Sequence, residues 1–137
     1  MKYLLLPLTT LLLLTGCDDK AMVTVYKKQI TQTPIDCMKL SVFPEEPMIT
    51  RTLSRRYHFR DDCDLTLEVS YKSGIRCNSS FNAATKATTT FPTSYLKMEL
   101  RRGMSLQYSY YIDLTEKPTQ RDVNSGFDRL EKDLKLQ

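Results

Sequence analysis

Four cysteines, a single histidine and one dense acidic cluster are the side chains of this sequence that could carry out chemistry. The cluster is Arg60-Asp61-Asp62-Cys63-Asp64, whose carboxylates could bind calcium, an ion that takes roughly six to eight oxygen ligands. The glycine and the distal glutamate of an EF-hand loop are absent, and Arg60 opposes the acidic charge. We therefore interpret the cluster as a solvated turn between strands, and we predict no metal and no cofactor.

Histidine exchanges protons near neutral pH, so His58 could act as a general acid or base together with Asp61 or Asp62. Nucleophilic catalysis also needs a nucleophile and an orienting third group, and no sequence pattern marks a serine beside His58. A lone histidine in an alternating segment is usually exposed or packed. We predict that the protein is not an enzyme, and a small hydrolase that uses His58 is the weakest alternative.

The first cysteine, Cys17, ends an apolar run that follows Lys2. Residues 3–14 are nearly all apolar, yet the run is shorter than the roughly 20 residues that a helix needs to span a bilayer. A positive start, a short apolar stretch and small residues before a break are typical of a secretory signal peptide. Residues 1–16 are therefore predicted to be a cleaved signal peptide.

The end of this run, Leu14-Thr15-Gly16-Cys17, resembles the lipobox of bacterial lipoproteins. In that class the cysteine thiol is alkylated by diacylglycerol, the signal is removed before the cysteine, and the new amino group is usually acylated as well. The resemblance implies that Cys17 is lipidated and that residues 17–21 form the anchor and a short tether. Membrane lipid would then be a partner, since two or three acyl chains hold a protein stably.

The resemblance also bears on location, because Asp18 directly follows Cys17. In enteric lipoproteins an aspartate at this place is associated with retention in the inner membrane. The implied location is the inner membrane, with the domain facing the periplasm. The outer membrane or the cell surface is the alternative.

Residues 22–137 have the length and composition of one globular domain. Without the sixteen signal residues the chain has 121 of its 137 residues, and the formal charge falls from +4 to +3 because Lys2 is removed. The basic residues occur as scattered pairs mixed with acids, and we therefore predict no nucleic-acid partner.

The remaining cysteines, Cys37, Cys63 and Cys77, would face an oxidising compartment, where at most one intramolecular disulfide forms and one thiol is left. Their spacing does not match a zinc site. If residues 38–43 and 48–60 form a hairpin, Cys37 and Cys63 lie at the same end of it. Cys77 follows a turn at the far end of the next strand, so we predict a Cys37–Cys63 disulfide.

Apolar and polar residues alternate along much of the domain, with the period of half-buried strands. The clearest segments are 63–71 and the pair 96–101 and 104–114, which predicts a long hairpin that turns at Arg102-Gly103. With the weaker segments this gives about seven strands, and the predicted fold is mainly β, an antiparallel β-sandwich of the immunoglobulin-like type. The weaker segments are 22–30, 38–43, 48–60 and 75–77, with a loop or edge strand at 83–90.

The end of the chain changes to a helical period. Residues 119–136 carry one apolar stripe, and Thr119 with Asp122 predicts an N-cap and an acidic first turn. Gly126 lies inside the helix and weakens the prediction by about 1 kcal/mol relative to alanine. We expect the stripe to cover the domain's own core rather than to bind a partner. The stripe consists of Val123, Phe127, Leu130 and Leu134.

Tyrosines are grouped near the second strand of the long hairpin. In a strand, Tyr108 and Tyr110 share the core face, while Tyr111 points to the other face. Tyr111, together with Tyr95 and less firmly Tyr57, could form an exposed recognition surface, because tyrosine offers a large and rigid contact. Tyr95 and Tyr111 are our candidate partner contacts.

The short tether, the strands and the terminal helix resemble small envelope lipoproteins with immunoglobulin-like domains. That resemblance implies adhesion, envelope assembly or partner binding, and we predict a non-enzymatic, lipid-anchored module of this kind with an envelope protein as partner. Residues 63–69 are also superficially similar to the membrane-bound lysozyme inhibitors, small lipoproteins with a β-barrel and a disulfide. The serine-glycine and tyrosine loop that such inhibitors insert into an active site has no match here, and inhibition of a lysozyme-like enzyme is the alternative.

Overall fold

The computed structural model describes residues 20–76 and 91–137, and the structural statements below concern these residues. They contain five strands, which are β1 (Met22–Val25), β2 (Lys39–Phe43), β3 (Leu65–Lys72), β4 (Ser94–Arg102) and β5 (Ser105–Leu114). The helices are α1 (Gln29–Gln32), α2 (Pro47–Ser54) and α4 (Gln120–Asp133). Cys17, Cys77 and the segment 83–90 lie outside the described residues.

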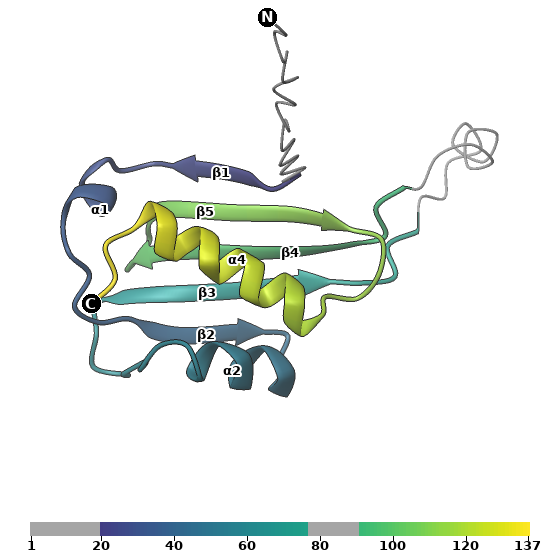
Figure 1. Cartoon of the computed structure of the whole chain (residues 1–137), viewed down its shortest axis with the longest axis horizontal. Helices are drawn as coiled ribbons and strands as arrows, with labels where there is room; N and C mark the ends of the chain where they lie inside the picture. Colours follow the sequence, from purple (N-terminus) through teal and green to yellow (C-terminus); the bar gives the residue numbers. More distant parts are fainter. Residues whose placement is uncertain (1–19, 77–90) are drawn as a thin grey trace, which may run out of the picture.

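The strands form one sheet in the order β1-β5-β4-β3-β2, so β1 and β2 are its two edges (Figure 1). Strand β2 is parallel to β3, and the other neighbours are antiparallel. Helices α2 and α4 pack on each other and on the same face of the sheet. The fold is therefore mainly β, as predicted, with a helical layer on one face.

The seven strands and the second sheet of an immunoglobulin-like sandwich, both expected from the sequence, are not seen in the described residues. An apolar sheet face must be buried against another layer, and here α2 and α4 supply that layer. No helix or second sheet of the described residues covers the other face of this sheet.

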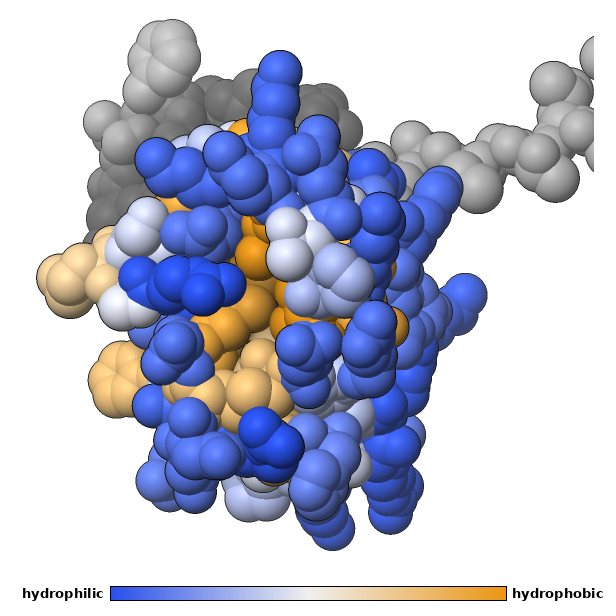
Figure 2. All heavy atoms as spheres, turned by 90° about the vertical axis from the view of Figure 1, so that its left-hand side faces the viewer, coloured by the Kyte–Doolittle hydropathy of each residue, from blue (hydrophilic) through white to orange (hydrophobic). Residues whose placement is uncertain are grey.

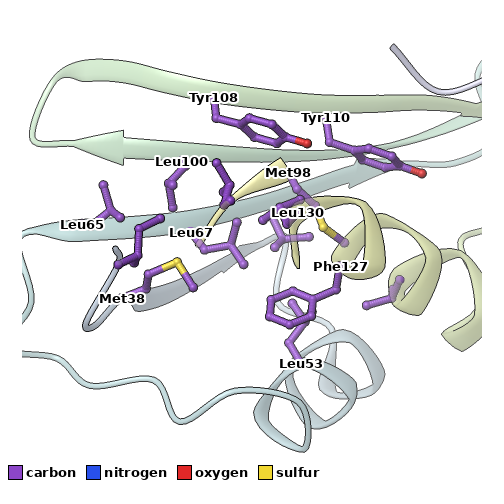
Figure 3. Packing of buried hydrophobic residues seen from close by; sticks show 14 of the residues in the cluster. Met38, Leu53, Leu65, Leu67, Met98, Leu100, Tyr108, Tyr110, Phe127 and Leu130 are labelled. Atoms are coloured by element: carbon purple, nitrogen blue, oxygen red, sulfur yellow. The ribbon is translucent and has the colours of Figure 1, made fainter. Parts of the chain in front are cut away.

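The core lies between the sheet and the two helices (Figure 3). Alternate residues of the three central strands point into it, and the apolar stripe of α4 meets them from the other side. Tyr108 and Tyr110 are buried there, as the period of β5 predicted. The largest fully buried side chains also include Met38, Ile49, Leu53, Leu67, Leu96, Met98, Leu100, Phe127 and Leu130.

The strand predicted over residues 48–60 is wrong, because this segment begins with helix α2. Glu46 is the N-cap and its side chain accepts from the Met48 amide, while Pro47 occupies the first turn, where a missing amide hydrogen does no harm. Ile49 and Leu53 are four residues apart and both are buried, which is a helical spacing. The sequence carried this signal, and the alternation of the flanking segments masked it.

The predicted Cys37–Cys63 disulfide is present, with the two Cα atoms 5.9 Å apart. Its geometric reason differs from the predicted hairpin. Cys37 and Cys63 each lie just before a strand, and these strands, β2 and β3, are parallel and start at the same end of the sheet. The bridge thus closes the β2–α2–β3 unit.

The hairpin predicted around Arg102-Gly103 is confirmed as β4 and β5, and Gly103 has the positive φ that such a turn requires. The return strand predicted at 75–77 is wrong for its described part, because β3 pairs with β4 instead. Ile75 donates its amide hydrogen to the carbonyl of Thr93, which joins the segment after β3 to the segment before β4.

The C-terminal helix is confirmed as α4, with Thr119 as its N-cap and Asp122 completing a capping box. Its stripe covers the core, as expected. Gly126 lies where a Cβ atom would be 2.9 Å from Met98 Cε and 3.0 Å from Tyr110 Cε1. At this position α4 packs so closely on β4 and β5 that a larger side chain would clash, which explains a glycine in the middle of the helix.

Candidate functional site

The face of the sheet that α2 and α4 leave open gathers side chains from all five described strands. We call it the open sheet face. Its members alternate with the buried residues of each strand, and most are polar or charged. They are Met22 and Thr24 of β1, Ser109, Tyr111 and Asp113 of β5, Tyr95, Lys97, Glu99 and Arg101 of β4, Thr66, Glu68, Ser70 and Lys72 of β3, and Lys39, Ser41 and Phe43 of β2.

Charged side chains at the centre of the open sheet face form an ion-pair network. Glu68 and Glu99 stand directly opposite each other on β3 and β4, a register that would repel without a cation. Arg101 lies between them, with Nε 3.0 Å from Glu68 Oε2 and Nη2 2.8 Å from Glu99 Oε2. Lys97 Nζ is 3.2 Å from the other oxygen of Glu99. The network neutralises the middle of the face and fixes its side chains.

Glu99 is the most enclosed member of this network, with a side chain that is 12% exposed. Partial burial raises the pKa of Glu99, but hydrogen bonds from Arg101 and Lys97 outweigh this effect and leave the pKa below the ordinary carboxyl value. Glu99 therefore stays charged at neutral pH and holds Lys97 and Arg101 in place through its two carboxylate oxygens. An acid catalyst would need the opposite shift.

The two tyrosines proposed as partner contacts come together on the open sheet face. The rings of Tyr95 and Tyr111 are stacked, with centroids 5.6 Å apart and planes inclined by 27°. The Tyr111 hydroxyl donates to Asp113 Oδ1 at 2.7 Å, and this hydrogen bond, aided by partial burial, raises the pKa of Tyr111 to about 12. The Tyr111 phenol therefore stays neutral, and the stacked pair forms an aromatic surface outside the core.

Neighbouring strands place further side chains around the tyrosine pair. Met22 is the register partner of Tyr111 on β1, and it is 63% exposed. Lys97 faces Tyr111 from β4, and Lys72 faces Tyr95 from β3. The aromatic pair thus has an apolar neighbour on one side and cationic neighbours on the other. We call these five residues the tyrosine patch.

Tyr57, the third tyrosine considered for recognition, is not part of the tyrosine patch. Its ring packs on Phe59 in the segment after α2, with centroids 5.0 Å apart, and both side chains pack against the core. Desolvation raises the pKa of Tyr57, as expected for a half-buried phenol. Tyr57 is a packing residue.

His58 is exposed and lines a shallow hollow of about 450 Å³ with Arg56 and Arg60. Asp61 lines a different hollow, and Asp62 is paired with Arg60, whose Nε lies 3.3 Å from Asp62 Oδ1. Among the described residues, neither aspartate forms a hydrogen bond or an ion pair with His58.

The acidic cluster around Cys63 lies in an exposed turn, in agreement with its interpretation as a solvated connection. Within residues 20–76 and 91–137, no three histidine, cysteine or acidic side chains are placed to hold a metal ion. The same residues contain no helix that is long and apolar enough to cross a membrane.

Another hollow, of about 570 Å³, lies at the end of the sheet beside α1. Figure 2 looks onto this end, where apolar surface shows between hydrophilic side chains. The lining of the hollow includes the apolar side chains of Ile35 and Leu65, two cationic residues and two acidic residues. The charged residues are Lys27, Arg102, Asp36 and Asp64. Since the two signs of charge balance, the hollow has no preference for an anion or for a cation.

No protein-family model matches this chain, no curated protein is significantly similar to it, and no solved structure matches it significantly. Functional inference therefore depends on the chain's own residues and their arrangement. Tyr95 and Tyr111, the partner contacts predicted from the sequence, are stacked on each other in the structure.

Proposed function

We propose that this protein is a lipid-anchored module of the bacterial cell envelope that binds a partner protein through its open sheet face. The lipobox-like residues before Cys17 support the anchor. The stacked Tyr95–Tyr111 pair carries the binding part of the proposal, because it is an ordered aromatic surface that the core does not need.

The chemistry of the tyrosine patch favours a protein as the ligand. Paired tyrosines present a rigid surface that loses little side-chain entropy on binding, and tyrosine is enriched among residues that dominate interface energies. Met22 adds apolar area, and Lys72 and Lys97 add cationic groups at the rim. The patch therefore suits an apolar partner surface with acidic groups around it.

Site-specific photo-crosslinking in intact cells tests the binding face. A photoreactive amino acid at Ser109, in the middle of β5 on the open sheet face, is expected to crosslink one envelope protein, and Tyr111→Ala should reduce the yield at least about tenfold, as for a hot spot of 1.4 kcal/mol or more. The matched control carries the same group at Ser125, an exposed residue of α4 in the opposite layer. Equal yields from the two positions, or no effect of Tyr111→Ala, would contradict the proposal.

The anchor is tested separately by intact-mass measurement of the mature protein. Lipidation predicts a chain that begins at Cys17 and carries the mass of the acyl groups, and Cys17→Ala should abolish both. A chain that is cleaved elsewhere, or that carries no lipid, would refute the anchor while leaving the binding face open to its own test.

The location follows from Asp18 under the same proposal. We propose the inner membrane, with the domain in the periplasm, by the retention rule of enteric lipoproteins. Membrane fractionation of the wild type and of Asp18→Ser checks this: a shift of the variant to the outer membrane is expected, and an unchanged distribution would make Asp18 an ordinary linker residue.

A further inference from the structure

Edge strand β1 exposes an unusual share of apolar side chains. Six large apolar side chains are classed as exposed among the described residues, and Met22, Val25 and Tyr26 are three of them. Their exposed fractions are 63%, 41% and 52%. These three residues lie within a five-residue stretch, whereas the other three are spread over the chain. These side chains project from the edge strand on both sides, with Met22 on the open sheet face and Val25 on the helix-covered side, and we call Met22, Val25 and Tyr26 the apolar strip.

Lysines flank this strip on both sides. Lys20 precedes β1, Lys27 and Lys28 follow it, and all three are exposed. An apolar and aromatic segment between lysines has the composition that favours a membrane–water interface, where tyrosine rings sit at headgroup level and lysine side chains reach the phosphates. Asp18 and Asp19 offset two of these charges, so the apolar contact carries more of the attraction than the lysines do.

The tether brings this strip to the membrane. Met22 is the fifth residue after Cys17, and an extended chain over those five steps spans at most about 17 Å. The lipid anchor of the proposed function therefore holds β1 closer to the bilayer than any other strand. Strand β2 lies at the opposite edge, four strand spacings or about 19 Å away across the sheet (Figure 1).

We infer that the β1 edge, from Lys20 to Lys28, lies on the lipid headgroups and holds the sheet upright on the bilayer. This inference rests on the lipid anchor of the proposed function and adds an orientation to it. The open sheet face would then be roughly perpendicular to the membrane plane, and β2 would be the strand farthest from the lipid. A partner of the tyrosine patch would bind beside the bilayer, because Met22 belongs to both surfaces.

A second copy of the chain is the competing occupant of a free strand edge. Pairing of two β1 edges would bring the three lysines of each copy together, and like charges in that arrangement repel. The lipid headgroups offer the opposite charge, and the tether already holds the strip against them. The charge pattern therefore favours the lipid surface.

The chain has no tryptophan, so a single substitution introduces a unique fluorescent probe. Tyr26→Trp places it on the strip, and Phe43→Trp places it at the opposite edge of the same sheet, where Phe43 is 77% exposed. Each full, acylated protein is bound to vesicles of phosphatidylethanolamine and phosphatidylglycerol that contain brominated phosphatidylcholine. The tryptophan at position 26 is expected to emit at shorter wavelength and to lose about half of its emission to the brominated lipid, as a group at headgroup depth would. The control at position 43 should keep its emission.

Equal emission of the two variants with and without bromine would overturn the inference. A second result would also overturn it. If the emission of the tryptophan at position 26 is protected from an aqueous quencher but is not quenched by brominated lipid, the residue is covered by protein, such as a second copy of the chain. The mass of each preparation is measured first. A chain without acyl groups refutes the anchor, whereas an acylated chain without quenching refutes only the orientation.

Discussion

The two faces of the sheet are built from the same strands and use opposite means of stabilisation. On the helix-covered face, Leu67, Met98 and Tyr110 are removed from water and packed against α4. On the open sheet face, the residues between them, such as Glu68 and Glu99, are held by ion pairs and hydrogen bonds in contact with water. One face therefore fixes the fold, and the other is available for contacts.

This division has a consequence for mutation. Apolar burial contributes about 1.5–3 kcal/mol for a large side chain, whereas an exposed ion pair contributes about 0–1 kcal/mol. Substitutions on the covered face should therefore change stability, and most substitutions on the open face should change binding. Each of the following predictions tests one side of this contrast.

The largest effect is expected for Phe127→Ala on the covered side. Phe127 is fully buried, its ring lies beneath the Arg56 guanidinium at 5.3 Å, and it faces Leu53 of α2 (Figure 3). Removal of the ring should lower the free energy of unfolding by about 3–5 kcal/mol in urea denaturation followed by circular dichroism. Phe43→Ala at an exposed position of β2 is the matched control and should change it by less than about 0.5 kcal/mol. Similar losses from both would break the contrast between the faces.

The next effect concerns Gly126, where helix propensity and packing oppose each other. Alanine improves the helix by about 1 kcal/mol, but its Cβ would lie within 3.0 Å of Met98 and Tyr110 atoms, and overpacking costs about 1–3 kcal/mol. We expect Gly126→Ala to destabilise the protein by about 1 kcal/mol, while Ser125→Ala, on the exposed side of the same helix, should be neutral or slightly stabilising. A rise in the melting temperature of Gly126→Ala would show that the helix has room to move away from the sheet.

Local signals in the sequence predicted the parts of the fold that local interactions determine. The capping box of Thr119 and Asp122 and the turn at Gly103 each depend on only a few neighbouring residues, and both are present. The parallel pairing of β2 with β3 was missed, because it depends on the helix that crosses between them. Glu46 and Pro47 mark the start of that helix, and they were interpreted as part of a loop.

The candidate site was predictable only in part. The period of β5 placed Tyr111 opposite to the buried Tyr108 and Tyr110, and this orientation is confirmed. The stacking of Tyr95 on Tyr111 and the pairing of Arg101 with two glutamates depend on the register between strands. Register is set by long-range pairing, so no single segment of the sequence encodes it.

A smaller effect is expected on the open sheet face for Arg101→Met. The substitution leaves Glu68 and Glu99 opposite each other without their shared cation, and we expect a loss of about 1 kcal/mol at neutral pH. Arg102→Met is the control, because Arg102 is exposed and the described residues include no ion-pair partner for it. Equal losses from the two variants would show that the network contributes nothing specific.

The same variant has a defined pH dependence. In the wild type the folded-state pKa of Glu99 lies below its unfolded value, so its contribution is complete above the unfolded pKa and is lost as the pH falls through the folded pKa. Without Arg101, the effect of burial on the pKa of Glu99 is opposed by Lys97 alone, and acid unfolding should begin at a higher pH. Stability curves of both proteins, measured over the acidic range, check the direction of this shift.

The smallest effect is expected for the hydrogen bond between Tyr111 and Asp113. Asp113→Asn replaces the charged acceptor with a neutral amide oxygen and weakens this bond, so it should lower the pKa of Tyr111 from about 12 toward the ordinary value of about 10, as measured by ultraviolet titration of the phenol. Because the folded-state pKa is raised, the contribution of this bond to stability is present below the unfolded pKa and is lost as the pH rises through the folded pKa. At neutral pH this contribution is fully present, but its loss should change the unfolding free energy only slightly, because both side chains are in contact with water. If Asp113→Asn instead destabilised the protein as much as Phe127→Ala does, the open sheet face would have to be counted as part of the folding core, and its tyrosines could not be considered free for a partner.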